Sequence, residues 1–428
     1  MIKIDSSKIE EFNQQNQNQH NHSFEFLCTE LISQGIDIES ILTNLITFQV
    51  AVPSWALGSG GTRFGRFPIG GEPRNLEEKI EDVGLIHALN NSSGAVSLHI
   101  PWDIPKDSQA IKDLAAEYNL VFDAVNSNTF QDQVDQEYSY KYGSLSHTSK
   151  QVREQAVAHN KEVIKFGEEL GSKALTVWLA DGSNFPGQQN FREALNRTKD
   201  SLTEIYDSLP SDWRLLIEYK PFEPNFYSMV IPDWGTSFML ASKIGDRAKT
   251  LVDLGHHLPN TNIEQIVAIL LNENKLGGFH FNDSKYADDD LTTGSIKPYQ
   301  LFLIFNELID ESLNHNEVFE STAWMIDASH NVKDPLEDLI QSLEAINQAY
   351  AKALLINRLA LKQARDNNDP VKAQELLQTA FQTDVRPLLR EARLRKQAAL
   401  DPLGAYRYFE VRKQLIAKRG TDTVATGL

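Results

Sequence analysis

Short apolar runs alternate with longer amphipathic segments between residue 46 and about residue 335. The apolar runs are nearly continuous, which is typical of strands that are covered on both faces. Most of the segments between them are rich in Ala, Leu, Glu and Lys, which favour helices. Repetition of this strand and helix unit predicts an α/β fold, a closed parallel (β/α)8 (TIM) barrel. The eight expected strands are ITFQVAVP (46–53), VSLHI (96–100), LVFDAV (120–125), ALTVWLA (174–180), RLLIEYK (214–220), TLVDLG (250–255), GGFHFND (277–283) and AWMID (323–327).

Helical patterns flank the expected barrel on both sides. The polar tract NQQNQNQHNH (13–22) reads as a frayed lead-in, and a stretch with apolar residues at helical spacing follows it. From about residue 336 the chain predicts long helices, whose apolar stripes suit packing under the barrel or on a neighbouring subunit. We therefore predict an N-terminal helical lead-in (1–45), a barrel (46–335) and a C-terminal helical extension (336–428).

Charge and cysteine content narrow the class of protein. The 428 residues include 41 basic and 59 acidic side chains, a net charge of -18. This charge repels phosphate backbones and argues against nucleic acid and anionic membranes as partners. Cys28 is the single cysteine, which excludes an intrachain disulfide and a thiolate metal cluster. With no signal peptide pattern and no apolar run of about 18 residues, we expect a soluble cytoplasmic protein.

Polar and aromatic residues follow nearly every expected strand. Because the carboxyl ends of barrel strands converge on one mouth, these side chains are expected to share it. Any one of them can be a helix cap or a satisfied core group, but the set favours a functional site. The residues are Trp55, His99 with Trp102 and Asp103, Asp123 with Asn126, Trp178 with Asp181, Glu218 with Lys220, Asp253 with His256, His280 with Asp283, and Asp327.

Carboxylates and imidazoles in this set are the ligands that hard and borderline divalent cations prefer. The run ADDDLTTG adds Asp288 and Asp290, which point the same way in an extended segment. A triple aspartate alone is usually a solvated acidic turn. Metal binding by Asp288 and Asp290 is therefore predicted only because of the polar residues at the neighbouring strand ends. The candidate ligands are Glu218, Asp253, His256, His280, Asp288, Asp290 and Asp327.

Two further features bear on chemistry. Strand alternation places Lys220 on the same face as Glu218, either as a plain ion pair or as a donor that polarises a substrate oxygen. The glycine-rich stretch GSGGTRFGRFPIGG (58–71) lacks the Lys-Ser/Thr of a phosphate loop. It is better interpreted as a loop after the first strand that orders over the mouth or reaches a partner chain.

Several motifs together resemble a known enzyme family. In chain order the motifs are SWALGSGGTRFGRFP, SLHIPWD, LIEYKP, LVDLGHHLPNTN, GGFHFNDSKYADDDL and MIDASHNVKDP. They resemble the L-rhamnose isomerases of the broad-specificity bacterial type, with the motifs in the same chain order and at matching separations. Those enzymes belong with the xylose isomerase-like barrels. The resemblance runs from about residue 46 into the C-terminal helices. It implies conversion of L-rhamnose to L-rhamnulose, and of other aldoses, by a metal-assisted hydride shift.

The resemblance also implies roles for single residues and a homotetramer. It implies two divalent ions per subunit, Mn2+ first, with Co2+, Mg2+ or Zn2+ as alternatives. The first metal site would comprise Glu218, Asp253, His280 and Asp327, and the second His256, Asp288 and Asp290 with Asp253 as the bridge. The implied catalytic residues are Lys220, His99 and Asp103, and the implied sugar contacts are Trp102, Trp178, Ser329 and Phe64, the last from an adjacent subunit.

Three other functions stay open at this point. A ketose 3-epimerase on the same barrel would use one metal and two glutamates, and Lys220 with the Asp288/Asp290 pair argues against it. A barrel-type abasic-site endonuclease also uses clustered metal ligands, but the charge of -18 argues against DNA binding. A non-catalytic metal or sugar-binding protein would keep the ligands and have no use for Lys220.

Overall fold

A closed parallel sheet forms the centre of the computed structural model, which describes residues 4–58, 67–315, 317–330 and 332–422. Two of its strand runs are interrupted. Leu98 separates β2 (Ala95–Ser97) from β3 (His99–Ile100), and two residues separate β4 (Val121–Phe122) from β5 (Val125–Ser127). The other strands are β1 (Ala51–Pro53), β6 (Ala174–Val177), β8 (Arg214–Glu218), β10 (Ala248–Asp253), β11 (Leu276–Phe281) and β12 (Ala323–Ile326).

The pairing of these strands closes the ring. Their order is β3-β5-β6-β8-β10-β11-β12-β1-β2-β4. Since β2 pairs with β4 and β3 pairs with β5, the two ends of this order belong to the same two strand runs. All pairings within this sheet are parallel. The eight-stranded parallel barrel predicted from the sequence is therefore confirmed.

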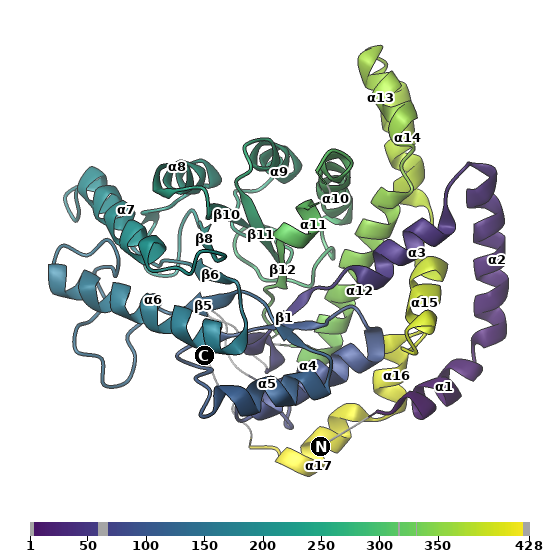
Figure 1. Cartoon of the computed structure of the whole chain (residues 1–428), viewed down its shortest axis with the longest axis horizontal. Helices are drawn as coiled ribbons and strands as arrows, with labels where there is room; N and C mark the ends of the chain where they lie inside the picture. Colours follow the sequence, from purple (N-terminus) through teal and green to yellow (C-terminus); the bar gives the residue numbers. More distant parts are fainter. Residues whose placement is uncertain (1–3, 59–66, 316, 331, 423–428) are drawn as a thin grey trace.

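Helices cover the outside of the sheet, as Figure 1 shows. Several begin at an Asn or Asp whose side chain accepts a hydrogen bond from the first turn, including Asn75, Asp107, Asn190 and Asp233. These caps explain why the helices start directly after polar loops. The covering helices are α4 (Leu76–Asn90), α5 (Ser108–Glu117), α6 (Lys150–Leu170), α7 (Phe191–Asp207), α8 (Trp234–Ile244), α9 (Ile263–Asn272), α10 (Pro298–Ser312) and the short α11 (Val318–Ser321), and a 3-10 turn, η1 (Ser54–Leu57), follows β1.

Alternation along β11 separates the core from the site. Phe279 and Phe281 stack on each other with ring centroids 5.3 Å apart, and Phe281 stacks on Phe305 of α10 at 6.0 Å. These rings therefore face the surrounding helices. His280 between them points to the opposite face of the strand, toward the barrel interior. One strand thus supplies packing on its outside and a metal-ligand candidate on its inside.

The N-terminal polar tract is helical rather than frayed, so that part of the sequence interpretation is wrong. Residues 13–22 lie across α1 (Ser6–Gln14) and α2 (Gln17–Ser33), and α3 (Ile38–Thr47) includes the first two residues of the expected first strand. Asn13 donates to the carbonyl of Ala398 at 2.9 Å, and His20 lies 3.1 Å from Glu391. The tract is ordered because the C-terminal extension supplies partners for its polar groups.

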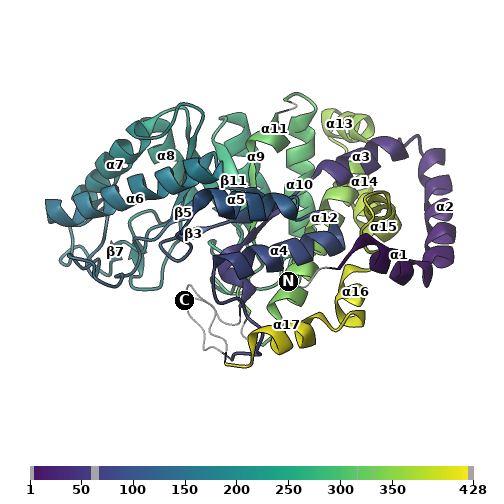
Figure 2. The ribbon, with the colours of Figure 1, turned by 60° about the horizontal axis from the view of Figure 1, so that its bottom comes forward.

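The described part of the C-terminal extension consists of helices joined by short loops. The long helix α12 (Pro335–Leu354) packs against the barrel through a largely buried face. Two helices, α13 (Arg358–Asp366) and α14 (Pro370–Gln382), project from the body (Figure 1). The next two helices, α15 (Arg386–Arg395) and α16 (Pro402–Tyr408), lie beside the N-terminal helices (Figures 1 and 2). No strand follows Ile326 within residues 332–422.

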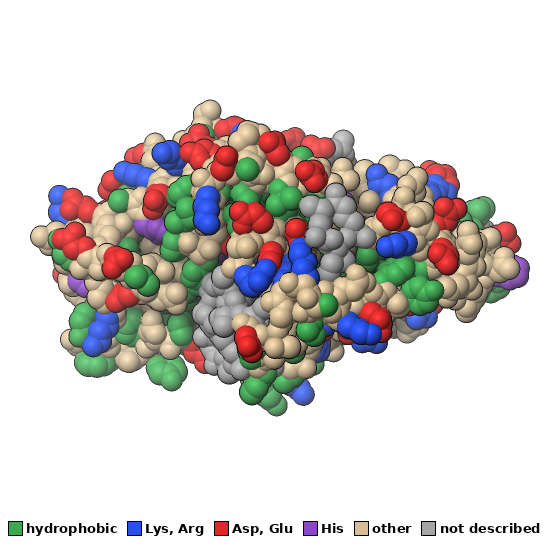
Figure 3. All heavy atoms as spheres, turned by 90° about the horizontal axis from the view of Figure 1, so that it is seen from below, with side chains coloured by type: hydrophobic (Ala, Val, Ile, Leu, Met, Phe, Trp, Pro, Cys, Tyr) green, Lys and Arg blue, Asp and Glu red, His purple; other side chains and the backbone are tan. Residues whose placement is uncertain are grey.

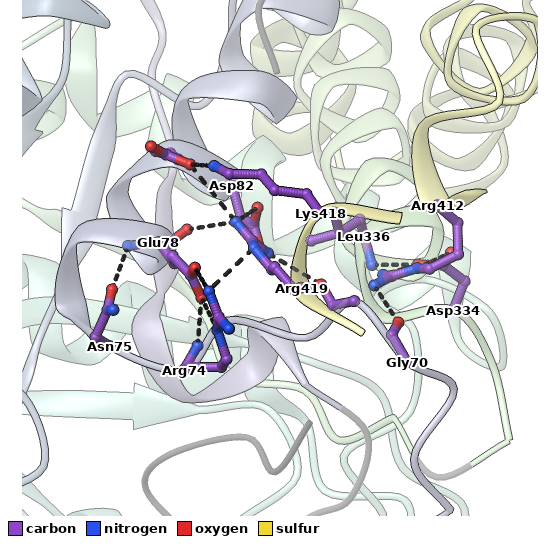
Figure 4. Close-up of polar contacts among 12 residues, drawn as sticks. Gly70, Arg74, Asn75, Glu78, Asp82, Asp334, Leu336, Arg412, Lys418 and Arg419 are labelled. Carbon is purple, nitrogen blue, oxygen red and sulfur yellow. Dashed lines mark hydrogen bonds and ion pairs between the residues drawn. The ribbon is translucent and has the colours of Figure 1, made fainter. Parts of the chain in front are cut away.

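The last helix, α17 (Val411–Arg419), fastens the extension to the first and last barrel units (Figure 4). The buried Arg419 guanidinium donates to both carboxylate oxygens of Asp82 on α4 at 2.8 Å, and to the carbonyl of Gly71 at 3.0 Å. Arg412 makes a second bidentate pair with Asp334, at 2.7 and 2.8 Å. Both pairs have the fork geometry of strong charge-assisted hydrogen bonds.

Acidic and basic side chains are interspersed on the described part of the face seen from below in Figure 3. This face shows no broad field of basic charge of the kind that nucleic acid binding requires. Within the described residues, no helix is both long enough and apolar enough to cross a membrane.

Candidate active site and metal centre

Four adjacent strands, β8, β10, β11 and β12, deliver the first set of ligand candidates. Glu218 and Asp253 are the last residues of β8 and β10, His280 is opposite Asp253 in the register, and Asp327 follows β12 directly. One ligand atom from each of these four residues lies within 4.8 Å of all the others. The set that the sequence predicted as the first metal site therefore converges.

A second set adjoins the first. Asp253, His256 and Asp288 also place one ligand atom each within 4.8 Å of one another. His256 belongs to the loop after β10, and Asp288 to the loop after β11. Asp253 is fully buried and common to both sets. A carboxylate in this position can bridge two cations.

The ligand atoms within these sets lie closer together than their hydrogen bonds account for, although His280 Nδ1 and Glu218 share one such bond. The Nδ1 atom of His280 lies 3.2 Å from Glu218, 3.4 Å from Asp327 and 3.7 Å from Asp253, although one ring nitrogen cannot bond all three carboxylates. His256 Nε2 lies 3.4 Å from Asp288 Oδ1, yet this buried oxygen makes no hydrogen bond. Converging buried acceptors of this kind fit a bound cation.

The pKa values in the cluster also show an excess of buried negative charge. Burial, together with the carboxylates of Asp288 and Glu218, raises the pKa of Asp253 to about 7. Against the effect of burial, the carboxylates of Glu218 and Asp327 raise the pKa of His280 to about 10. Despite its burial, the pKa of His256 is likewise raised well above its usual range by the carboxylates of Asp253 and Asp288. The donor set of carboxylates and imidazoles fits divalent cations.

Neighbouring groups hold the ligand carboxylates in position. Asn282 donates to both oxygens of Asp253 at 3.0 and 3.2 Å, and the backbone N–H of Gly255 donates to it at 2.7 Å. The indole N–H of Trp55 donates to Asp327 at 2.9 Å. Sequence reasoning did not assign these supports. Asn282 stands two residues after His280, on the same strand face, which was the available signal.

Asp290 lies beside the second set rather than within it. Its carboxylate lines the pocket and accepts a hydrogen bond from Ser329 Oγ at 3.0 Å. Burial, with the neighbouring carboxylate of Asp288, raises the pKa of Asp290 well above its usual range. A predicted ligand, Asp290, and a predicted sugar contact, Ser329, are thus in direct contact with each other.

Lys220 lines the same pocket, but its ion-pair partner is not Glu218. Its ammonium lies 2.5 Å from Asp288 Oδ2 and 5.4 Å from the centroid of the Trp178 ring. Both Lys220 and Asp288 are buried. The single described ammonium in the pocket therefore stands next to the second ligand set, between a carboxylate and an aromatic wall.

Aromatic rings form the other wall of the pocket. Trp55, Trp102 and Trp178 line it as expected, and Phe130 adds a ring that sequence reasoning did not assign to it. Phe130 lies 4.7 Å from Trp178 and Trp102 lies 4.3 Å from the His99 ring, between ring centroids. Phe64, expected from an adjacent subunit, lies outside the described residues.

His99 lies in this wall, whereas Asp103 does not. Burial lowers the pKa of His99 to about 3, so the imidazole is neutral at pH 7. Asp103 is 1% exposed, and its carboxylate binds Lys79 at 2.6 Å, Ser54 at 2.5 Å and the backbone N–H of His99 at 2.8 Å. It lies behind the wall and does not line the pocket, which a catalytic contact of the kind implied by the family resemblance would require. Asp103 positions His99 through the backbone.

The fold and the site together define a class, a parallel (β/α)8 barrel with carboxylate and imidazole ligand candidates at the carboxyl ends of adjacent strands. The chain belongs to the xylose isomerase-like TIM barrel family, whose model matches residues 91–319.

Curated relatives cover almost the whole chain. A probable sugar isomerase of Rhizobium meliloti (strain 1021) is 50% identical over 418 residues, which are 98% of this chain and 97% of the relative. A probable sugar isomerase of Mesorhizobium japonicum is 52% identical over 401 residues, 94% of this chain and 93% of the relative. Among solved structures, the D-allulose 3-epimerase from Methylomonas sp. in complex with D-allulose has a TM-score of 0.51 at 14% identity, over 71% of this chain and 98% of that one. The last likeness shows the fold alone.

Proposed function

We propose that the protein is an aldose–ketose isomerase that converts L-rhamnose to L-rhamnulose and accepts other aldoses. One observation supports the proposal most strongly. Two adjoining sets of metal-ligand candidates and the Lys220 ammonium lie at a single pocket lined by tryptophans. Two relatives at 50% and 52% identity that are named as probable sugar isomerases support the reaction class. The motif resemblance supports the choice of sugar.

The proposed cofactors are two divalent ions, Mn2+ first. One would be held by the set of Glu218, Asp253, His280 and Asp327, and the other by the set of Asp253, His256 and Asp288 with Asp290 beside it. A bound divalent ion supplies Lewis acidity that polarises the sugar carbonyl.

The chain's own residues would perform the remaining steps. The neutral His99 imidazole has a buried Nδ1 without a hydrogen-bond partner, and a neutral ring can take up or return a hydroxyl proton during ring opening. The Lys220 ammonium would donate to the reacting oxygens as negative charge develops on them. Hydrogen then moves with its electron pair from C2 to C1, while the O2 proton ends on O1.

The aromatic wall has a separate task in this scheme. Trp102, Trp178 and Phe130 would exclude water from the reacting carbons. We further propose a homotetramer in which Phe64 of an adjacent subunit completes this wall. Light scattering of the purified protein tests the assembly, and Phe64→Ala should raise KM for the sugar without changing the assembled mass. A monomer with full activity would contradict this part.

A ketose 3-epimerase is the competing activity on this barrel. It would need two glutamates as proton-transfer groups, and Glu218 is the only glutamate among the described residues that line the pocket. The mechanism we propose also differs from a base-mediated one in the fate of hydrogen. A carboxylate or imidazole base would hold the abstracted proton where it exchanges with water.

The experiment follows deuterium from C2 of L-rhamnose in the manganese-loaded enzyme. We expect most of the label at C1 of L-rhamnulose, with little entry of hydrogen from water into carbon. Near-complete loss of label to water would exclude the hydride transfer. Conversion of ketoses at C3, without any aldose product, would identify an epimerase instead.

A further inference from the structure

A cavity larger than the pocket that holds the metal-ligand candidates lies elsewhere in the described chain. Its volume is about 520 Å³, against about 80 Å³ for the pocket that contains Lys220. The cavity lies where the loop after β11, residues 292–295, meets α12, the end of α14 and the starts of α15 and α16. It thus lies between the barrel and the C-terminal extension, and junctions of this kind are frequent ligand sites. We call it the junction cavity.

Basic residues are concentrated in the junction cavity of an otherwise acidic protein. Its lining includes five cations and only two carboxylates, while the whole chain carries a net charge of -18. The cations are Lys333, Lys352, Arg386, Arg390 and Arg393, and the carboxylates are Glu344 and Asp401.

Three of these cations already have acidic partners. Lys333 lies 2.6 Å from Asp338, Arg386 lies 2.7 Å from Asp384, and Arg393 lies 2.7 Å from Glu344. Lys352 and Arg390, in contrast, have no carboxylate within ion-pair distance among the described residues. The Lys352 ammonium rests instead 4.5 Å from the centre of the Phe381 ring. Burial, with the nearby Arg386, lowers the pKa of Lys352 against the attraction of the Asp384 carboxylate, so a bound anion would further stabilise the charged ammonium.

Buried donors without partners indicate the same chemistry. Thr293 is 1% exposed and its hydroxyl makes no hydrogen bond, and the Nε–H of the buried Arg393 has none either. Both residues line the cavity. Buried polar atoms are normally satisfied, so each of these two marks a place where a ligand atom can bind. Leu301, Ile340 and Phe381 add an apolar surface beside them.

We propose that the junction cavity binds a small phosphorylated molecule, with the phosphate at Lys352 and Arg390 and the organic body on the apolar surface. Guanidinium and ammonium groups together suit phosphate oxygens, and the volume exceeds what a bare phosphate would fill.

The junction cavity also shares its walls with the metal-ligand candidates. Thr292 and Thr293 lie two and three residues after Asp290 along the chain, and Lys333 lies six residues after Asp327. Asp338 joins the two loops, because it accepts hydrogen bonds from both Thr292 and Lys333. A phosphorylated ligand would therefore contact the loops that carry Asp290 and Asp327.

The test uses glucose 6-phosphate, inorganic phosphate and glucose as probes, with calorimetric titration of the full-length, metal-loaded protein. We expect saturable binding of glucose 6-phosphate, weaker binding of phosphate, and no binding of glucose in this cavity. The variant Lys352→Met/Arg390→Gln should weaken glucose 6-phosphate binding at least about tenfold, because two charged donors are lost.

Two control proteins locate the binding. Lys150→Met/Arg192→Gln makes the same charge change on the exposed surfaces of α6 and α7 and should bind like the unmodified protein. Asp288→Asn perturbs the metal centre and should leave glucose 6-phosphate binding intact. Equal affinity in the cavity variant and the unmodified protein, or loss of binding in Asp288→Asn alone, would overturn the proposal. One other combination of results would also overturn it: the unmodified protein binds no phosphate, and the cavity variant changes the mass of the assembly. The cavity would then be an interface between copies of the chain.

Discussion

Replacement of Lys79 by Met tests whether the wall that carries His99 depends on a buried charge outside the pocket. Lys79 and Asp103 are each 1% exposed, and their charged atoms are 2.6 Å apart. Met keeps the length of the side chain and removes its charge, so the Asp103 carboxylate is left buried without a counter-charge. Breaking a buried pair in this way costs about 3 to 5 kcal/mol.

This cost can be converted into a melting temperature. An unfolding entropy of roughly 2 cal/mol/K per residue over 428 residues amounts to about 0.9 kcal/mol/K, so Lys79→Met should lower the apparent Tm by about 3 to 6 °C. Turnover should also fall, because Asp103 holds the His99 backbone and Ser54, and Trp55 next to Ser54 contacts Asp327. Metal content should stay unchanged, since Lys79 contacts no ligand candidate.

The double variant Lys79→Met/Asp103→Asn provides the matched control. It removes both charges and keeps an acceptor for the His99 N–H, so most of the lost stability should return. Differential scanning calorimetry and steady-state kinetics of both variants measure the two effects. If Lys79→Met melts with the unmodified protein, or if the double variant is less stable than Lys79→Met alone, the buried pair does not support the wall.

Four other outcomes are expected. Removal of divalent ions by a chelator should abolish isomerase activity and Mn2+ should restore it, and full turnover without metal would contradict a metal-dependent mechanism. Asp290→Asn should weaken metal binding only at the second site and leave the fold intact. Lys220→Met should reduce kcat on the order of 10²-fold with little change in metal content, and an unchanged rate would leave Lys220 only as the ion-pair partner of Asp288. Burial lowers the pKa of His87 to about 4, so the stability that its neutral ring contributes above pH 6.5 is lost as the pH falls toward 4. Between pH 7 and pH 4.5, the free energy of unfolding of the unmodified protein should therefore fall by about 2 to 3 kcal/mol more than that of His87→Gln. Denaturant unfolding at the two pH values measures this difference.

The barrel and its ligand candidates could be predicted because both depend on local patterns. Apolar runs indicated the strands, and the residue at the end of each strand indicated what reaches the mouth. Glu218, Asp253, His280 and Asp327 converge for this reason. The prediction needed only the sheet order, because the ends of neighbouring parallel strands are neighbours in space.

Features that depend on distant partners could not be predicted in this way. His20 lies in a polar tract that looks unstructured on its own, and its partner Glu391 is 371 residues away along the chain. Asp103 stands four residues after His99, which suggested joint action on a substrate. Its orientation is decided instead by Lys79 on α4 and Ser54 after β1, neither of which carries any signal in the sequence.

Helix α4 explains why an acidic barrel keeps two buried cations near its first unit. Lys79 and Asp82 are one turn apart on this helix, and each is paired with an opposite charge from another segment, Lys79 with Asp103 and Asp82 with Arg419. A helix that carries one buried charge of each sign can be seated in only one register, since any shift would strand both charges in an apolar interior. The pair to Arg419 ties that register to the last helix of the chain, and the pair to Asp103 ties it to the wall that holds His99. The C-terminal extension therefore contributes to the geometry of the pocket through α4, although none of its described residues lines the pocket.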